Sequence, residues 1–340
     1  MDVAGLLGIL AGIVVIALAG VGWKFSNVVL RPNRRSLESM EAEQIAAGQL
    51  APGEYGALQS EPFTLQSPYG YRVEGEWLMP SGDAMPPGRG LNGTSSEAMP
   101  PPGALSARAV VITHGYGVNR VNSVKYARLF LAQGFQVVIY DHGNSGTSGG
   151  AFTTMGHREK DDLKAVTDAV FSRLGPDAFV GTHGESMGAA TVLLHAAMEP
   201  RLAFVIADCP YADLRMQLAY RLKVEYRIPP FPILDAASLG AWLRAGFRFG
   251  SVSPVRTLEA QGGMPGMPML FIHGLADDYI PPEASERLHA AKRGRSELLL
   301  MPDAGHAESI SAHPGRYDAA VRAFVDAVLA SRAKTGRTTM

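Results

Sequence analysis

The stretch VGTHGESMGAAT, residues 180–191, sets Ser186 between two glycines, each two positions away. A short apolar run leads into it, and the helix-like run MGAATVLLHAAME follows. Such a strand, tight turn and helix raises a serine hydroxyl above the carboxyl edge of a parallel sheet. Gly184 and Gly188 suit the turn, because a side chain at either position would clash with neighbouring backbone. The bare pattern G-x-S-x-G arises easily by chance in a chain with 38 glycines, so its surroundings must support it.

The surroundings alternate between strand-length apolar runs and helix-like segments. Strands are expected near 63–67 and 71–79, and then at 109–115, 135–141, 178–184, 202–209, 269–274 and 297–302. The later runs lack period-two alternation, which is typical of strands buried on both faces. The segments 157–175 and 313–334 each carry a single apolar stripe. The sequence therefore predicts an α/β fold with a mostly parallel central sheet and helices on both faces.

A long segment, 212–250, interrupts this alternation after the sixth strand. It is rich in arginine and in aromatic residues such as Tyr226 and Trp242. We interpret it as a helical insertion that lies over the site. The alternative is a solvated helical pair whose arginines only cover apolar surface.

Two further polar residues follow late strands in the order that a serine nucleophile requires. A serine hydroxyl needs a base within hydrogen-bond reach, and the base needs an orienting acid. Asp277 follows the run at 269–274, and His306 follows the run at 297–302. In this type of fold the expected order is serine, acid, histidine. The predicted triad is Ser186, Asp277 and His306.

An oxyanion hole is expected where the first long strand ends in His114-Gly115-Tyr116-Gly117. Glycines there let the backbone turn so that an N–H faces the serine. We assign the Tyr116 and Met187 N–H groups as donors to the developing alkoxide. His114 competes with His306 as the base, but its place in the turn before the nucleophile favours a structural role.

Composition limits the other classes of function. The formal net charge of −1 gives no global field that favours nucleic acid. The single cysteine, Cys209, excludes an intrachain disulfide framework and a cysteine-based zinc site, and it is expected to be buried. Neither a metal nor an organic cofactor is expected, and the oligomeric state is left open.

Residues 3–23 carry no charged side chain and are numerous enough to cross a bilayer as a helix. A cleaved signal peptide would fit the small residues Ala17 and Ala19, but it needs a basic start, and the chain begins Met1-Asp2. We therefore expect a single-pass membrane anchor. Positive charges follow the span and none precedes it, so the positive-inside rule places the bulk of the chain in the cytoplasm; a signal peptide would reverse this.

Together these motifs resemble the α/β-hydrolase superfamily. More closely, they are similar to a bacterial branch with an N-terminal anchor and to prolyl-oligopeptidase-type and acylaminoacyl-peptidase-type hydrolase domains. The motifs are HGYG, YDH, KDDL, HGESMGA, ADCPYADL, QLAYRL, SPV, FIHGLADDYIP and GHAES. The resemblance covers roughly 61–332 and gives the same triad. One departure is the turn 143–146, Gly-Asn-Ser-Gly, where the superfamily often has an arginine and a histidine.

The expected organisation follows from the resemblance and from composition. Residues 1–23 are the anchor, 24–60 a connector, 61–332 the α/β-hydrolase domain and 333–340 a tail. Within the domain, 81–107 is rich in proline and glycine and is expected to be a flexible loop, and 212–250 is the cap-like insertion.

The resemblance implies a serine hydrolase that cleaves small-molecule carboxylic esters through an acyl-enzyme. A peptidase or amidase is the first alternative, and an acyltransferase would use the same acyl-enzyme. A non-catalytic, membrane-anchored binding protein on the same scaffold is the alternative from a different class.

Overall fold

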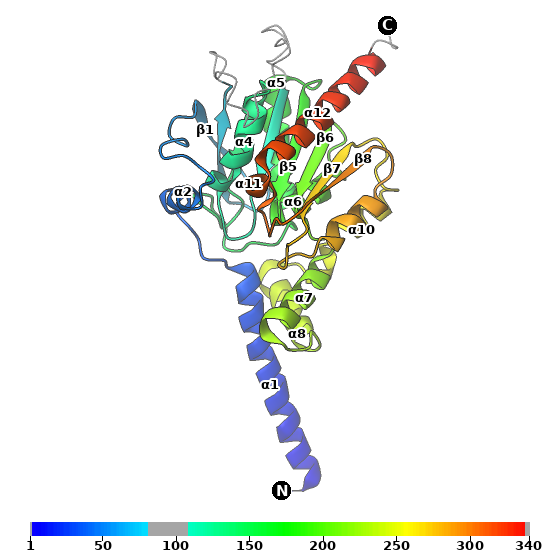
Figure 1. The fold of residues 1–340 in the computed structure, drawn as a ribbon. Coiled ribbons are helices and arrows are strands. Elements are labelled where there is room, and N and C mark those ends of the chain that lie inside the picture. The colour runs from blue at the N-terminus through cyan, green and yellow to red at the C-terminus, as the bar shows by residue number, and fades with distance from the viewer. Residues whose placement is uncertain (1, 81–107, 337–340) are drawn as a thin grey trace.

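A computed structural model describes residues 2–80 and 108–336 of the 340-residue chain. Its body is a central sheet covered by helices, and one long helix, α1, extends away from that body (Figure 1). The expected flexible loop at 81–107 lies outside the described residues.

The sheet has eight strands in the part of the chain that the structure describes. They are β1 (Ser60–Gln66), β2 (Arg72–Leu78), β3 (Arg108–Thr113), β4 (Gln136–Tyr140), β5 (Phe179–Glu185), β6 (Phe204–Asp208), β7 (Met269–Gly274) and β8 (Ser296–Met301). Their spatial order is β1-β2-β4-β3-β5-β6-β7-β8. The pairs β1–β2 and β2–β4 are antiparallel, and every pair from β4 to β8 is parallel. The carboxyl ends of the parallel strands therefore meet at one edge.

Helices cover both faces of this sheet. They are α2 (Leu37–Ala46), α4 (Val124–Leu131), α5 (Glu159–Leu174), α6 (Met187–Ala196), α9 (Pro254–Ala260), α10 (Glu283–Ala291), α11 (Ser309–Ala312) and α12 (Pro314–Gly336). One core joins α4 and α12 to the strands, through residues such as Phe130, Val110 and Phe324. The other core packs α5 and α6 on the opposite face, through residues such as Leu163 and Val111. Alternate residues of β3 thus enter different cores, as a strand buried on both sides requires.

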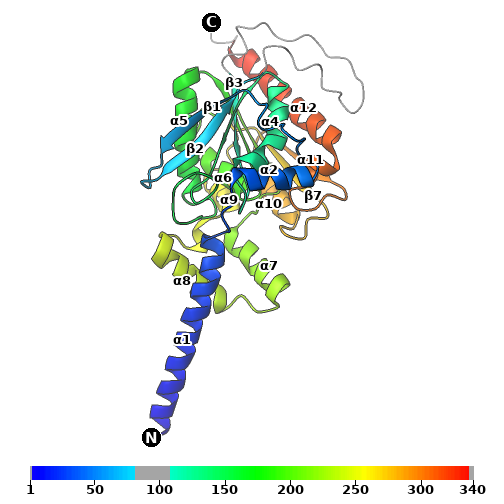
Figure 2. The same ribbon diagram turned by 90° about the vertical axis from the view of Figure 1, so that its left-hand side faces the viewer.

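The segment after β6 forms two helices, α7 (Leu214–Tyr226) and α8 (Ile233–Ala245). The Asp213 side chain accepts the Met216 N–H and so begins α7. Gly246, in the left-handed region at φ 79°, ends α8. This pair lies at the end of the body from which α1 extends (Figures 1 and 2).

Helix α1 runs from Val3 to Leu30 and therefore continues seven residues beyond the predicted end of the anchor at residue 23. Among the described residues, it alone is long and apolar enough to cross a membrane. Its carboxyl-terminal part, from Gly22 onward, packs on α8. A Cβ added to Gly22 would lie 2.6 Å from the Ala236 carbonyl carbon, and one on Gly240 would lie 2.9 Å from the Ser26 hydroxyl oxygen.

Candidate active site

Ser186 occupies the tight turn between β5 and α6. Its backbone has φ 56° and ψ −114°, a conformation that L side chains rarely adopt. A Cβ on Gly184 would overlap the Gly188 carbonyl, and one on Gly188 would overlap the Thr113 carbonyl. The Ser186 N–H donates to the Asp208 carbonyl oxygen at 2.8 Å, which ties the turn to the end of β6. Packing on both sides therefore holds the strained turn in place.

The structure brings the three predicted triad side chains together. His306 Nε2 lies 3.0 Å from Ser186 Oγ, and His306 Nδ1 lies 2.7 Å from Asp277 Oδ2. Both separations are in hydrogen-bond range for a nucleophile, base and orienting acid. His306 follows β8 and Asp277 follows β7, so all three stand at the carboxyl edge of the sheet.

Asp277 is held on both oxygens. Its Oδ1 accepts the N–H groups of Tyr279 at 2.9 Å and Ile280 at 2.8 Å, and its Oδ2 also lies 3.2 Å from His273 Nε2. Burial alone would raise the pKa of Asp277, but the hydrogen bonds from His273 and His306 outweigh it and hold that pKa far below its ordinary value. The carboxyl group is therefore ionised and fixed in orientation. The adjacent Asp278 is exposed.

A buried ionic cluster lies directly beneath the turn. The Glu185 carboxylate is 2.6 Å from Lys125 Nζ and accepts hydrogen bonds from Asn122 Nδ2 at 2.8 Å and the Tyr126 hydroxyl at 2.7 Å. Burial would raise the pKa of Glu185, but its ion pair with Lys125 and these hydrogen bonds lower it. Glu185 therefore stays charged and connects the nucleophile turn to α4.

The loop predicted to form the oxyanion hole passes beside the turn. A Cβ on Gly115 would lie 3.6 Å from the Ser186 Cβ. Gly115, which precedes the predicted donor Tyr116, therefore lies beside the nucleophile, and the other predicted donor, Met187, directly follows Ser186 in the chain. The Tyr116 hydroxyl donates to the Val28 carbonyl of α1, which ties this loop to the long helix.

His114 has a structural position. Its Nδ1 lies 2.8 Å from the Gly115 carbonyl, and its Nε2 accepts the His142 N–H at 3.0 Å. The ring is fully buried, and burial lowers its pKa. Both ring nitrogens are therefore occupied by backbone, as the sequence predicted for a structural histidine.

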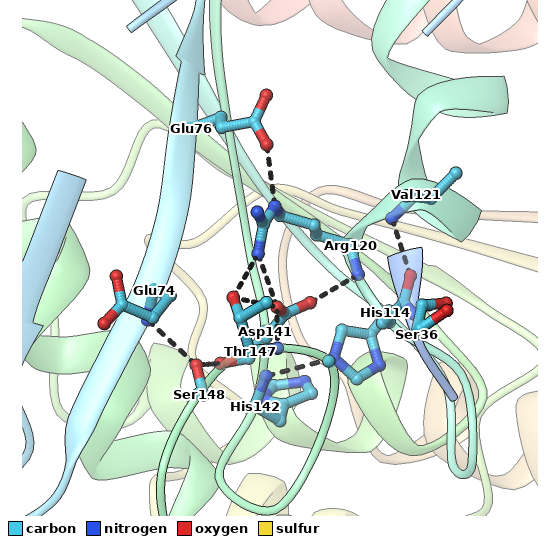
Figure 3. Close-up of polar contacts among 12 residues, drawn as sticks. Ser36, Glu74, Glu76, His114, Arg120, Val121, Asp141, His142, Thr147 and Ser148 are labelled. Atoms are coloured by element: carbon cyan, nitrogen blue, oxygen red, sulfur yellow. Dashed lines mark hydrogen bonds and ion pairs between the residues drawn. The ribbon is translucent and has the colours of Figure 1, made fainter. Parts of the chain in front are cut away.

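The turn at 143–146, which departs from the superfamily pattern, lies between Asp141 and Thr147, two residues of a polar network (Figure 3). Asp141 accepts the Arg120 N–H and the Thr147 N–H, each at 2.8 Å, and Arg120 Nε reaches Glu76 at 2.8 Å. The Ser148 hydroxyl donates to the Asp141 carbonyl at 2.7 Å. These bonds hold the residues on both sides of the turn.

Cys209 lies next to the candidate triad. Its sulfur, an Asp277 oxygen and a His306 nitrogen are all within 4.8 Å of one another. Burial, reinforced by nearby carboxylates, raises the pKa of the Cys209 thiol well above its ordinary value. The thiol therefore stays protonated at neutral pH.

Several contacts around the site escape sequence reasoning. These are the bonds from Tyr116 to Val28, from Lys125 to Glu185 and from His273 to Asp277. Lys125 is nine residues past Tyr116, in a helix whose pattern marks it only as polar. The HG pair at 273–274 is the one usable signal, since it places His273 at a strand end beside the acid.

The sheet order, the strained serine turn and the convergence of serine, histidine and aspartate at the sheet edge define an α/β hydrolase. Solved structures with the same fold include the Pyrococcus furiosus esterase Pf2001, with a TM-score of 0.60, 18% identity and coverage of 87% of this chain and 98% of that one. Another is Est1E from Butyrivibrio proteoclasticus, solved with ferulic acid bound, with a TM-score of 0.58, 17% identity and coverage of 79% and 99%.

The chain belongs to the prolyl oligopeptidase family, which matches residues 122–332. The uncharacterized protein YqkD of Bacillus subtilis is 34% identical over 317 residues, which make up 93% of this chain and 95% of that protein. The uncharacterized protein YfhR of Escherichia coli K12 is 28% identical over 186 residues, 53% of this chain and 56% of that one. The predicted superfamily, domain type and fold class are therefore confirmed.

Proposed function

We propose that the protein is a serine hydrolase that cleaves carboxylic esters through an acyl-enzyme. The observation that carries the proposal is the chain of contacts from Ser186 Oγ through His306 to Asp277, at 3.0 and 2.7 Å. A serine hydroxyl becomes an effective nucleophile when a base removes its proton as it attacks.

The reaction runs in two halves. Ser186 Oγ attacks the ester carbonyl while His306 Nε2 takes its proton, and Asp277 stabilises the imidazolium that forms. The Tyr116 and Met187 N–H groups bind the carbonyl oxygen as it becomes negative. His306 then returns the proton to the departing alcohol, leaving Ser186 acylated. In the second half, water attacks the acyl group, His306 takes the water's proton, and Ser186 leaves with that proton.

Peptide or amide cleavage is the second candidate, and membership of the prolyl oligopeptidase family favours it. The same residues would carry it out, but an amide needs firmer protonation of its leaving nitrogen and subsites for an extended chain. Ester cleavage needs neither this firmer protonation nor subsites for an extended chain. The Pyrococcus furiosus esterase of similar fold gives further support to ester cleavage.

Labelling with a fluorophosphonate probe tests the nucleophile. The probe should react once, at Ser186, and Ser186→Ala should abolish labelling and lower ester turnover by on the order of 10⁶-fold. Ser311→Ala, which removes an exposed serine five residues past His306, is the control and should label like the parent chain. Equal ester turnover by Ser186→Ala would overturn the mechanism.

Turnover of p-nitrophenyl esters and of aminoacyl p-nitroanilides distinguishes the two substrate classes. We expect Ser186-dependent release of nitrophenol and slow or no release of nitroaniline. Ser186-dependent hydrolysis of the anilides alone would replace the esterase proposal by the peptidase one. Binding of either substrate class without any turnover would favour the non-catalytic alternative.

A further inference from the structure

An apolar pocket opens between α1 and the α7–α8 pair. It encloses about 680 Å³, counting its open mouth. Its walls come from the last two turns of α1 (Phe25, Val28, Val29), from α7 (Leu218, Leu222) and from α8 (Ala237). The two charged residues at the pocket, Arg221 and Glu225, form an ion pair with each other. Apart from three tyrosine rings, the remaining wall is apolar and suits an apolar guest.

Two tyrosines link this pocket to the candidate triad. The Tyr279 ring lines the pocket and lies against the His306 imidazole, with 4.8 Å between ring centroids. Tyr116 also lines it, and its N–H is the proposed oxyanion donor. These two residues therefore connect the pocket wall to the base and to the proposed oxyanion donor.

The pocket lies at the depth of a membrane surface if α1 crosses the bilayer. A hydrocarbon core about 30 Å thick takes up roughly 20 helical residues, which from Val3 ends close to Trp23 and Lys24. Trp and Lys are the residue types that mark such an interface. The α1 residues in the pocket wall, 25–29, come directly after that point.

The α7–α8 pair presents apolar side chains at the same level. Phe231 is 75% exposed, Leu243 67% and Trp242 48%. Helix α8 packs along α1 at Gly22 and Ser26, and Arg244 at its end donates to Asn27 Oδ1 at 2.9 Å and covers the Trp23 ring at 4.4 Å. Because α8 contacts α1 at residues 22–27, these exposed side chains lie close to the membrane surface.

We infer that the pocket binds the alkyl chain of an acyl ester that arrives from the membrane surface, and that α1 is one wall of this substrate site. The inference rests on the proposed hydrolysis at Ser186. The preferred substrate is an amphiphile with one long acyl chain, whose chain lies along α1 and α8 while its ester carbonyl reaches Ser186. Helix α1 thus takes part in substrate selection as well as attachment.

The test compares hydrolysis of p-nitrophenyl octanoate and p-nitrophenyl acetate by the full chain in phosphatidylcholine nanodiscs, since a detergent would occupy the pocket. Two variants fill it from opposite walls: Val29→Trp on α1 and Ala237→Phe on α8. Each should lower the octanoate-to-acetate ratio of kcat/KM by at least about tenfold and keep acetate hydrolysis within about threefold. Leu218→Ala, which widens the pocket, should shift the preference toward decanoate.

Matched controls add the same side chains outside the pocket. Val21→Trp on α1 and Leu239→Phe on α8 alter exposed positions and should leave the ratio unchanged. If Ala237→Phe fails to fold, as loss of fluorophosphonate labelling would reveal, Val29→Trp and Leu218→Ala decide. If Val29→Trp keeps the octanoate-to-acetate ratio and Leu218→Ala keeps the parent preference for chain length, both with labelling intact, this inference is overturned and the hydrolase proposal stands. Absence of Ser186-dependent turnover in the parent chain overturns both.

Discussion

At the scale of single residues, the turn after β7 offers two neighbouring carboxylates, and the structure separates them. Asp277 is buried, and its carboxylate accepts the N–H groups of Tyr279 and Ile280 and pairs with Nδ1 of the His306 ring. Asp278 is exposed, and its backbone carbonyl accepts from Tyr220 and Arg221 of α7, each at 3.1 Å. One carboxylate therefore orients the imidazole, and the other lies toward solvent.

Asparagine substitutions distinguish the two. Asp277→Asn should lower ester turnover by roughly 10⁴-fold, because the amide can stabilise the wrong imidazole tautomer. Asp278→Asn keeps the shape of the same turn and should lower ester turnover by less than about tenfold. Steady-state kinetics at several pH values, with circular dichroism as the folding check, measures both. If Asp278→Asn loses most of its ester turnover and Asp277→Asn keeps it, the assignment of the orienting acid is contradicted.

Sequence reasoning reached these residues because each stands at a strand end in a fixed chain order. It missed the contacts that hold them, such as Lys125 to Glu185, since those join side chains far apart in the sequence and depend on how α4 packs. A period or a motif reports which face a residue lies on. It does not report which buried partner it meets there.

At the scale of elements, α1 extends beyond the apolar run that predicts the anchor. The apolar run ends at Trp23, but helix formation does not require apolar residues, and the next strong helix breaker is Pro32. Lys24, Ser26 and Asn27 therefore continue the helix to Leu30. The same seven residues supply part of the pocket wall, which the sequence had assigned to a connector.

The contact of α1 with α8 depends on small residues at four-residue spacing, Gly22 and Ser26 facing Ala236 and Gly240. Gly22→Leu should therefore separate the helices, because even a Cβ there would lie 2.6 Å from Ala236. Gly12→Leu places the same side chain where nothing lies within 4 Å. Limited proteolysis of the α7–α8 segment in nanodiscs should accelerate at least several-fold for Gly22→Leu only. Equal protection of both variants would mean that α1 and α8 are not packed as described.

At the scale of the whole molecule, buried histidines make folding sensitive to acid. Burial lowers the pKa of His183 and of His195 to about 3, against an ordinary value of 6.5. A group whose folded-state pKa is depressed favours folding fully above its unfolded pKa, and this stability is lost as pH falls toward the folded pKa. The stability that these two histidines contribute is therefore lost between pH 6.5 and about pH 3. Buried Asp162 and Asp208, with pKa raised to about 6, act in the opposite sense between about 6 and 3.8.

His195→Gln isolates one of these histidine contributions. Protonation of His195 should lower the free energy of unfolding of the parent chain by about 2 kcal/mol between pH 6.5 and pH 5, at about 1.4 kcal/mol per pH unit. The variant can keep a polar contact with the Thr167 hydroxyl, which lies 3.2 Å from His195 Nε2, but it takes up no proton. Urea unfolding followed by tryptophan fluorescence at the two pH values measures the difference. An equal decrease in the free energy of unfolding between pH 6.5 and pH 5 in both chains would show that His195 is not a buried neutral group.

The arrangement of the whole molecule also predicts that α1 has two separable parts. We expect the full chain to remain with membranes after an alkaline wash, because a spanning helix is held by burial of apolar surface. A chain that begins at residue 20 should leave the membrane and keep fluorophosphonate labelling at Ser186, since it retains the turns that pack on α8. A chain that begins at residue 32 also loses Ser26 and Leu30, both fully buried, so it should unfold at least several degrees lower. Thermal unfolding of the two truncated chains, compared side by side, makes the measurement. If both truncated chains unfold at the same temperature, the end of α1 is no part of the folded body. If the full chain is instead recovered as a soluble form that starts near Gly20, the apolar segment is a signal peptide and not an anchor.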